Sequence, residues 1–380
     1  MVGVDSSSRI ERISTVPGTE ELVINMGPQH PSTHGVLRVI LKLEGETVKD
    51  LDCDIGYLHR GTEKMGENLT YTMFIPYTDR LDYIAAPSSN LAWVQAVESF
   101  FDWEIPLRAL FIRTMVAELS RIASHLLWLA THALDIGAMT VFLWCFRERE
   151  MVLDLFERAF GARLTVNAFR LGGLYQDVPP QFLTEAQEFI DIFPSRVDDY
   201  ETLLTENRIW IQRTRGVGVI SAEDAMDYGM TGPILRASGV KWDLRRAKPY
   251  AAYPFVDFTV PIGENGDVYD RYLVRIIEMR QSAHIIDQCL DMLPEGPVSC
   301  KTPRTIKPPA GEIYHSIENP KGEFGFYVVS DGTETPYRVR IRPPSFIHLA
   351  GLKKLCVGVL LADVISIIGS IDIVLGECDR

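Results

Sequence analysis

The sequence predicts a mainly helical α+β fold with small antiparallel sheets near the N-terminus and in the C-terminal third. Three observations lead to this prediction. Residues 21–55 hold β-branched runs around a glycine turn, and residues 56–213 carry largely helical patterns with few breaks. A second set of β-rich runs follows within residues 325–341. Because hydrophobic periodicity is the primary local signal of secondary structure, we expect a helical core flanked by two sheets.

The N-terminal region predicts an arm followed by a sheet. Residues 1–20 are polar and lack the apolar core of a secretory signal, so we expect a flexible arm. Val36–Leu43 is rich in β-branched residues, and Gly45 leads into Thr47–Leu51. These two runs predict an antiparallel hairpin within residues 21–55.

Two histidines precede this hairpin in a segment unsuited to a regular helix. His30 and His34 are four residues apart, but Pro28 and Pro31 lack backbone N–H groups. We expect a tight loop on which two imidazoles face a ligand. A turn whose histidines hydrogen-bond the backbone is the alternative, and both interpretations stay open.

Pro106 starts the clearest helical segment, which runs from Leu107 to about Ala133. Proline is favourable in a first turn because its missing N–H would have no partner there. One side of this helix is apolar, and a polar stripe on the other side ends near Asp135. Such a stripe is usually the solvated face, which is what we expect; a buried network or a functional role is the alternative. The polar stripe consists of Thr114, Glu118, Arg121, His125 and His132.

Helical patterns recur at Thr140–Phe160, Thr184–Asn207 and Asp270–Met292. Residues 216–265 also contain many glycines and prolines, with β-prone pieces such as Phe255–Val260. We therefore expect mixed α/β structure over residues 214–345.

The last third combines a linker, a strand pair and an apolar segment. Thr302–Gly311 contains three prolines and predicts a stiff linker. Gly325–Val329 and Tyr337–Ile341 predict paired strands across a turn. Residues 346–380 predict a buried C-terminal segment. Its most apolar stretch, Leu355–Leu375, contains two aspartates that would be costly in lipid, so we expect protein core there.

Composition excludes several classes of protein. The formal net charge of -13 argues against a nucleic-acid-binding protein. None of the six cysteines forms a Cys-x-x-Cys pair or has a histidine nearby at ligand spacing. The pattern therefore favours free thiols over a disulfide framework or a zinc or iron–sulfur site.

Eight distinctive runs occur together along the chain. They are Gly27–Gly35, His59–Lys64, Asp79–Tyr83, His132–Ala138, Phe146–Glu150, Gly239–Arg245, Lys321–Gly325 and Gly376–Arg380. In this order they resemble the family of quinone-site D subunits of respiratory complex I, the NADH:quinone oxidoreductase, over residues 21–380. The resemblance implies a fold similar to the large subunit of nickel–iron hydrogenases, formed as a single domain.

The resemblance also implies a place in a proton-pumping complex. Quinone would be the substrate, while NAD and the terminal iron–sulfur cluster would belong to partner subunits. The expected partners are the B subunit, which bears that iron–sulfur cluster, the C subunit and the membrane-arm subunits. The chain would be peripheral, on the cytoplasmic side of the membrane or the matrix side in mitochondria, and inactive by itself.

The kinship with hydrogenases that the resemblance implies can be tested on the sequence. Hydrogenases bind nickel through an early Arg-x-Cys-x-x-Cys and a terminal Asp-Pro-Cys-x-x-Cys run. Here Arg80–Ala85 has no cysteine, Val374 and Glu377 replace the terminal cysteines, and Cys378 is one position out of register. Because a nickel–iron centre requires soft thiolates, we expect a metal-free site whose cavity is available to an organic ligand.

Three residues match the family's quinone-site positions. His34 and Tyr83 match the histidine and tyrosine that contact the quinone headgroup, and Asp135 matches a carboxylate paired with that histidine. Quinone reduction consumes two protons, and an imidazole and a phenol are both able to donate one. His30 matches the other loop histidine, for which a structural role is equally expected.

Arg60 matches an arginine near the partner's terminal cluster; a surface ion pair with Glu63 or Glu67 is the alternative. The chain departs from the family at Thr165, where many relatives carry a histidine near the cluster, and in its short region 303–312. The compact region resembles that of deazaflavin-linked relatives, so the electron donor stays open between NADH, deazaflavin and ferredoxin. A membrane-bound hydrogenase large subunit and a non-enzymatic scaffold are the competing functions, and the missing cysteines count against the hydrogenase.

Overall fold

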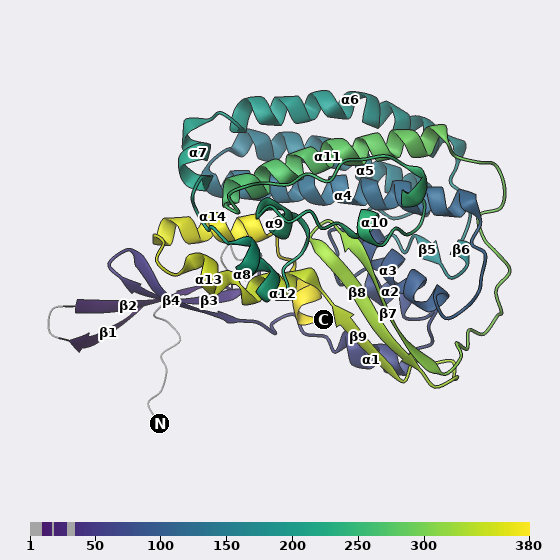
Figure 1. The fold of residues 1–380 in the computed structure, drawn as a ribbon, viewed down its shortest axis with the longest axis horizontal. Helices are drawn as coiled ribbons and strands as arrows, with labels where there is room; N and C mark the ends of the chain where they lie inside the picture. The colour runs from purple at the N-terminus through teal and green to yellow at the C-terminus, as the bar shows by residue number, and fades with distance from the viewer. Residues whose placement is uncertain (1–9, 17–18, 29–34) are drawn as a thin grey trace.

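The computed structural model describes residues 10–16, 19–28 and 35–380, and four long helices form its centre. They are α4 (Leu107–Ile136), α5 (Met139–Phe160), α6 (Pro180–Leu204) and α11 (Val268–Asp291). The four helices run side by side, with one sheet projecting at one end and a second sheet packed below the other end (Figure 1). This arrangement confirms the expected α+β class with a helical centre.

Helix α4 begins and ends at residues that suit a helix boundary. Pro106 precedes the helix with an extended backbone, and Gly137 follows it in the left-handed region at φ 107°. Glycine is favoured there because it has no Cβ to clash in that conformation. Gly161 ends α5 in the same way at φ 76°. The four helices predicted from periodicity are thus confirmed to within a few residues of their ends.

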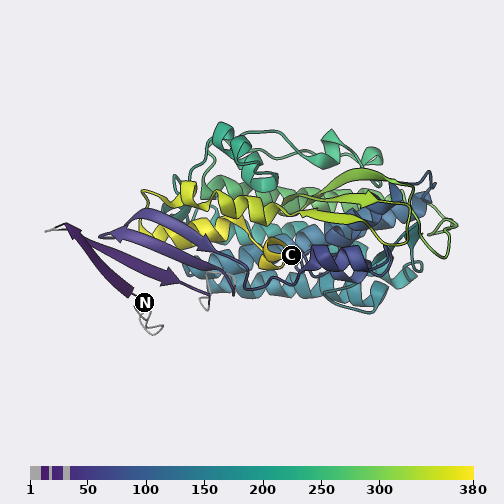
Figure 2. The same ribbon diagram turned by 90° about the horizontal axis from the view of Figure 1, so that it is seen from below.

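The N-terminal sheet has four antiparallel strands in the order of the sequence. They are β1 (Ile10–Val16), β2 (Thr19–Met26), β3 (Arg38–Glu44) and β4 (Thr47–Asp54). The predicted hairpin is confirmed as β3–β4. The prediction of a flexible arm over residues 1–20 is wrong for residues 10–16 and 19–20, because β1 pairs with β2 from Ile10 opposite Ile24 onward. Figure 2 shows this sheet extending from the helical body.

The second sheet is also antiparallel, in the order β7 (Gly311–Asn319), β8 (Gly322–Ser330) and β9 (Arg338–Arg342). The predicted strand pair is confirmed, with Phe326 opposite Ile341. The β-prone run Phe255–Val260 is not a strand. Its backbone N–H groups at Asp257 and Thr259 donate instead to side-chain oxygens of glutamines on α11, both at 2.8 Å.

Shorter elements connect these parts. Ahead of α4 lie α1 (Thr62–Asn68), α2 (Ile75–Thr78) and α3 (Ala86–Glu98). The middle of the chain adds β5 (Phe169–Arg170), β6 (Gly173–Leu174), α7 (Arg208–Thr214), α8 (Ala222–Asp227), α9 (Gly232–Ala237), α10 (Leu244–Ala247) and η2 (Tyr253–Phe255). The chain closes with α12 (Pro344–Ala350), α13 (Leu352–Cys356), α14 (Leu361–Ile371) and α15 (Leu375–Asp379).

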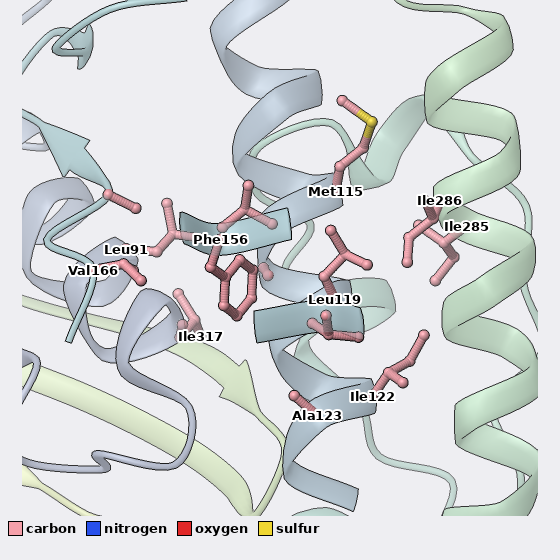
Figure 3. Packing of buried hydrophobic residues seen from close by; sticks show 14 of the residues in the cluster. Leu91, Met115, Leu119, Ile122, Ala123, Phe156, Val166, Ile285, Ile286 and Ile317 are labelled. Carbon is pink, nitrogen blue, oxygen red and sulfur yellow. The ribbon is translucent and has the colours of Figure 1, made fainter. Parts of the chain in front are cut away.

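The hydrophobic core surrounds α4. Leu119 and Ile122 of α4 face Ile285 and Ile286 of α11 across the helix contact (Figure 3). A second cluster joins the inner face of the N-terminal sheet to the C-terminal helices, so the expected burial of residues 346–380 is confirmed for most of that segment. Within the described ranges, no helix has the length and hydropathy needed to cross a membrane.

The polar stripe of α4 is buried, contrary to the solvated face that we expected. Its five residues are at most 1% exposed. Charged groups of α9, α11 and β7 face the stripe, and His125 Nε2 lies 2.9 Å from the Glu278 carboxylate. The alternative of a buried network is therefore confirmed, because other elements supply the partners that water would otherwise provide.

Candidate functional site

A cavity of about 150 Å³ opens beside the C-terminal half of α4. Segments far apart in the sequence line it: the turn before α3, α4 itself, and the segment that follows α14. Its wall includes Tyr83, Ser124, Trp128, Thr131, Asp372 and Val374. A phenol, hydroxyls and a carboxylate on a largely apolar wall suit a ring-shaped ligand with polar substituents.

Tyr83 is the predicted site residue that the structure places directly on this cavity. Burial and the adjacent Asp82 carboxylate raise the pKa of its phenol, so the hydroxyl keeps its proton at neutral pH. The ring packs against Gly376 of α15, where an added Cβ would lie 2.8 Å from two ring carbons of Tyr83. Only glycine leaves room for the ring at that point.

Asp135 lies in the last turn of α4 and is partly exposed. It follows the cavity-lining Thr131 by four residues, so both point to the same side of the helix. The structure thus brings Asp135 to the side of α4 that carries the cavity. His30 and His34 lie outside the described residues, so the predicted pairing of His34 with Asp135 stays a prediction.

Arg60 lies on the exposed surface just before α1. Its guanidinium donates to the carbonyl oxygen of Arg80 at 2.6 Å. Glu63 and Glu67, its alternative partners, both bind Arg338, at 3.2 Å and 2.8 Å. The positive charge of Arg60 also opposes the raised pKa of Tyr83, which places the arginine within electrostatic range of the cavity.

A buried cluster of charges at one wall of the cavity was not identified from the sequence. Lys321, at the end of the β7–β8 turn, is 1% exposed. Its ammonium lies 3.3 Å from Asp82 and 3.9 Å from Asp372, and it donates to Ser124 Oγ at 2.9 Å. Glu377 of α15 completes the cluster and is fully buried. Lys321 and Glu377 both lie in runs that carry the family resemblance, but no periodicity in the sequence predicts that they are close in space.

Burial controls the ionisation of this cluster. It raises the pKa of Glu377 to about 8, and the Asp82 carboxylate adds to the effect. Burial also raises the pKa of Asp372, against the opposing charge of Lys321. For Lys321 burial acts in the opposite direction, but the surrounding carboxylates outweigh it and raise the pKa. The ammonium therefore stays charged.

Behind the cavity wall, a second layer of ionic groups continues along the polar stripe. The Arg275 guanidinium stacks on the ring of Trp128, 4.3 Å from its centroid. Arg236 binds Glu278 and Glu318 at 2.7 Å each. Burial lowers the pKa of His125 to about 4, so this imidazole is neutral at physiological pH. This layer holds the helices in register around the cavity.

Among the described residues, no three histidine, cysteine, aspartate or glutamate side chains come together as a metal site. At the run matched to the early hydrogenase motif, Asp82 accepts from Asn319 Nδ2 at 2.9 Å. At the terminal run, Glu377 accepts from the backbone N–H of Ser345 at 2.8 Å. Asp82 and Glu377 thus each accept a hydrogen bond from the protein itself.

Comparisons with known proteins agree on one family. The model of the respiratory-chain NADH dehydrogenase 49 kDa subunit matches residues 135–308 and 301–380. The NADH-quinone oxidoreductase D 2 subunit of Solibacter usitatus is 57% identical over 367 residues, covering 97% of this chain and 99% of the relative.

Two further relatives extend this similarity. The NADH-quinone oxidoreductase D subunit of Geotalea uraniireducens is 54% identical over 387 residues, covering 95% of this chain and 99% of the relative. The D 2 subunit of Thermodesulfovibrio yellowstonii is 54% identical over 402 residues, covering 98% of this chain and 99% of the relative. The chain therefore belongs to the 49 kDa subunit family of respiratory NADH dehydrogenase, the family of complex I D subunits.

Proposed function

We propose that this chain forms the quinone-reduction site of a proton-pumping NADH:quinone oxidoreductase, together with the subunit that carries the terminal iron–sulfur cluster. Tyr83 would donate a hydrogen bond and then a proton to one carbonyl oxygen of the headgroup. His34 would do the same at the other oxygen, oriented by Asp135. The observation that carries the proposal is the placement of the Tyr83 phenol on the wall of the cavity beside α4.

The phenol suits this role. Its raised pKa keeps the proton on the hydroxyl until charge develops on the quinone oxygen. The cavity volume of about 150 Å³ is of the size of one substituted ring, and Trp128 offers it an aromatic wall. Polar groups confined to a few positions would orient such a ring.

The proposed kinship with the hydrogenase large subunit is supported by the charged cluster. Asp82 and Glu377 stand at positions where the matched hydrogenase runs carry cysteines, and in this chain both interact with the Lys321 ammonium. A protein cation would thus take the place of a metal. This substitution would leave the neighbouring cavity free for quinone.

The surface beside Arg60 is the proposed contact with the cluster-bearing B subunit. Arg60 and Arg80 are both exposed and adjacent, and their charges would favour the reduced cluster. The C subunit and the membrane-arm subunits are the other proposed partners. The chain would be peripheral, on the cytoplasmic side of the membrane, with electrons supplied by NADH or, alternatively, by deazaflavin or ferredoxin.

Tyr83→Phe tests the site in the assembled complex. The variant keeps the ring that packs on Gly376 and loses only the hydroxyl. We expect intact assembly and cluster reduction, with a higher KM for quinone or a lower turnover. One lost hydrogen bond corresponds to about 1–3 kcal/mol, or roughly a five- to a hundred-fold effect on kcat/KM. Asp135→Asn should act more mildly, by misorienting the imidazole and removing the charge that favours its protonated form.

Tyr272→Phe is the matched control. Tyr272 is a buried tyrosine whose hydroxyl lies 2.8 Å from Thr205 Oγ1, and it does not line the cavity that holds Tyr83. Its loss should leave quinone kinetics unchanged. Wild-type quinone kinetics in the Tyr83→Phe complex would show that the headgroup binds elsewhere.

A further inference from the structure

The charges in the cluster around Lys321 would not sum to zero if every group in it were ionised. Three buried carboxyls, Asp82, Asp372 and Glu377, surround one ammonium, and Arg275 adds a positive charge that acts on Asp372. With all three carboxyls ionised, the cluster would carry three negative charges against two positive ones. An uncompensated buried charge is costly, so the cluster is balanced when one carboxyl keeps its proton.

Glu377 is the carboxyl with the weakest ionic compensation, because the Lys321 ammonium forms ion pairs with Asp82 and Asp372 and no ion pair among the described residues involves Glu377. Asp82 accepts from Asn319 and lies 3.3 Å from Lys321. Glu377 accepts from the N–H of Ser345, whose hydroxyl also acts on it, and Glu377 Oε2, like Asp372 Oδ2, has no hydrogen-bond partner among the described residues. An unpaired buried carboxylate oxygen favours the protonated acid. Consistent with this geometry, the pKa of Glu377 is raised to about 8.

The cluster adjoins Tyr83 on two sides. Asp82 precedes Tyr83 in the chain, and Gly376, which precedes Glu377, contacts the Tyr83 ring. The charges of Asp82 and Lys321 both act on the phenol. Asp372 lines the same cavity as Tyr83. A proton held in the cluster is therefore next to the group that the proposed reaction would deprotonate.

We propose that Asp82, Asp372, Glu377 and Lys321 form a proton store that reprotonates Tyr83, with the transferable proton held on Glu377. This inference rests on the proposed quinone site. Glu377 acts through Tyr83 and does not touch the substrate.

Every proton and electron in the proposed transfer has a source and an acceptor. The partner subunit's iron–sulfur cluster would supply the two electrons, one at a time, and one of the two protons that the reduced quinone needs would leave the Tyr83 hydroxyl for a quinone oxygen. The resulting phenolate takes the proton of Glu377 by way of the Lys321 ammonium, so the O–H bond of Tyr83 reforms and Glu377 becomes a carboxylate. Lys321 stabilises that carboxylate until solvent returns a proton to it.

Glu377→Gln in the assembled complex tests this inference. The amide keeps the size of the side chain and the acceptor for the Ser345 N–H, but holds no transferable proton. We expect turnover to fall by about a hundred-fold or more, as for loss of general acid–base catalysis, with the KM for quinone unchanged. Glu148→Gln is the matched control, since Glu148 is 1% exposed and bonded to Tyr200 in a different part of the core.

The pH profile separates proton supply from a structural effect. The groups facing Glu377 are Asp82 and Lys321, with the N–H and hydroxyl of Ser345 from α12 and with Cys378 next in the chain. A store must be protonated to donate, so turnover of the wild-type complex should fall as pH rises through about 8. Glu377→Gln should abolish that alkaline fall, whereas Glu377→Asp should restore part of the turnover together with the fall.

Each possible result for these variants either supports or overturns the proton store. Unchanged turnover in Glu377→Gln would overturn the proton store, and so would an equal loss in Glu148→Gln. If Glu377→Gln fails to assemble, the Glu377→Asp profile decides, and a profile without an alkaline fall would refute the store. If Tyr83→Phe reduces quinone turnover and Glu377→Gln does not, the proposed quinone site stands and only the proton store is refuted.

Discussion

Arg236→Met should be among the most destabilising single substitutions in the described part of this chain. Arg236, on α9, is fully buried and bonds to Glu278 and Glu318 at 2.7 Å each, with Asp243 at 3.7 Å. Methionine would fill most of the space but would leave buried carboxylates without their main cation. Removing one partner of a buried ion pair costs about 3–5 kcal/mol. This is a large part of a total stability of about 5–15 kcal/mol.

Arg163→Met is the matched control. Arg163 also faces three carboxylates, on Glu150, Asp154 and Glu157, but its side chain is 41% exposed. Solvent screens such pairs, so the same substitution should cost less than about 1 kcal/mol. The comparison holds the residue types and the number of ionic partners constant and varies burial.

Urea unfolding of the purified chain, followed by tryptophan fluorescence and circular dichroism, measures both losses. The pH dependence adds a second criterion. In the wild type, Arg236 and the other charges facing Glu278 hold its pKa well below the usual range, so this stabilisation is lost as pH falls. Without Arg236 the folded-state pKa of Glu278 and Glu318 should rise, and the deficit should shrink as pH is lowered from 7 to 5. A loss below about 1 kcal/mol in Arg236→Met would refute the argument from burial.

Two further substitutions test the surroundings of the site. Arg60→Met removes a positive charge and should make the partner's cluster harder to reduce; redox titration by electron paramagnetic resonance measures the midpoint, and an unchanged midpoint would place Arg60 away from the cluster. Gly376→Ala puts a Cβ 2.6 Å from the Leu81 carbonyl oxygen and 2.8 Å from the Tyr83 ring, so the phenol must move. Turnover with quinone should then fall while cluster reduction persists, and wild-type kinetics would show that the position of this ring does not matter.

Local patterns in the sequence were sufficient to predict the main helices and strands. The ends of α4 follow from Pro106 and Gly137, and the β3–β4 hairpin follows from Gly45 between two β-branched runs. The order of the motifs was sufficient to identify the family. Among the site residues, the motifs predicted Tyr83, which lines the cavity. These features depend on residues within a few turns of one another, or on a match to relatives, and neither requires knowledge of the packing.

Only the tertiary structure decided which polar groups are buried. Periodicity places Glu118 and His125 on one face of a helix, but it does not reveal that α11 supplies Glu278 opposite that face. In the same way, Asp82 and Lys321 are more than two hundred residues apart in the sequence, and folding brings them to 3.3 Å. The free energy of a charged side chain depends on what surrounds it in space, so the burial of the charged stripe and the cluster beside Tyr83 emerges only when the elements pack.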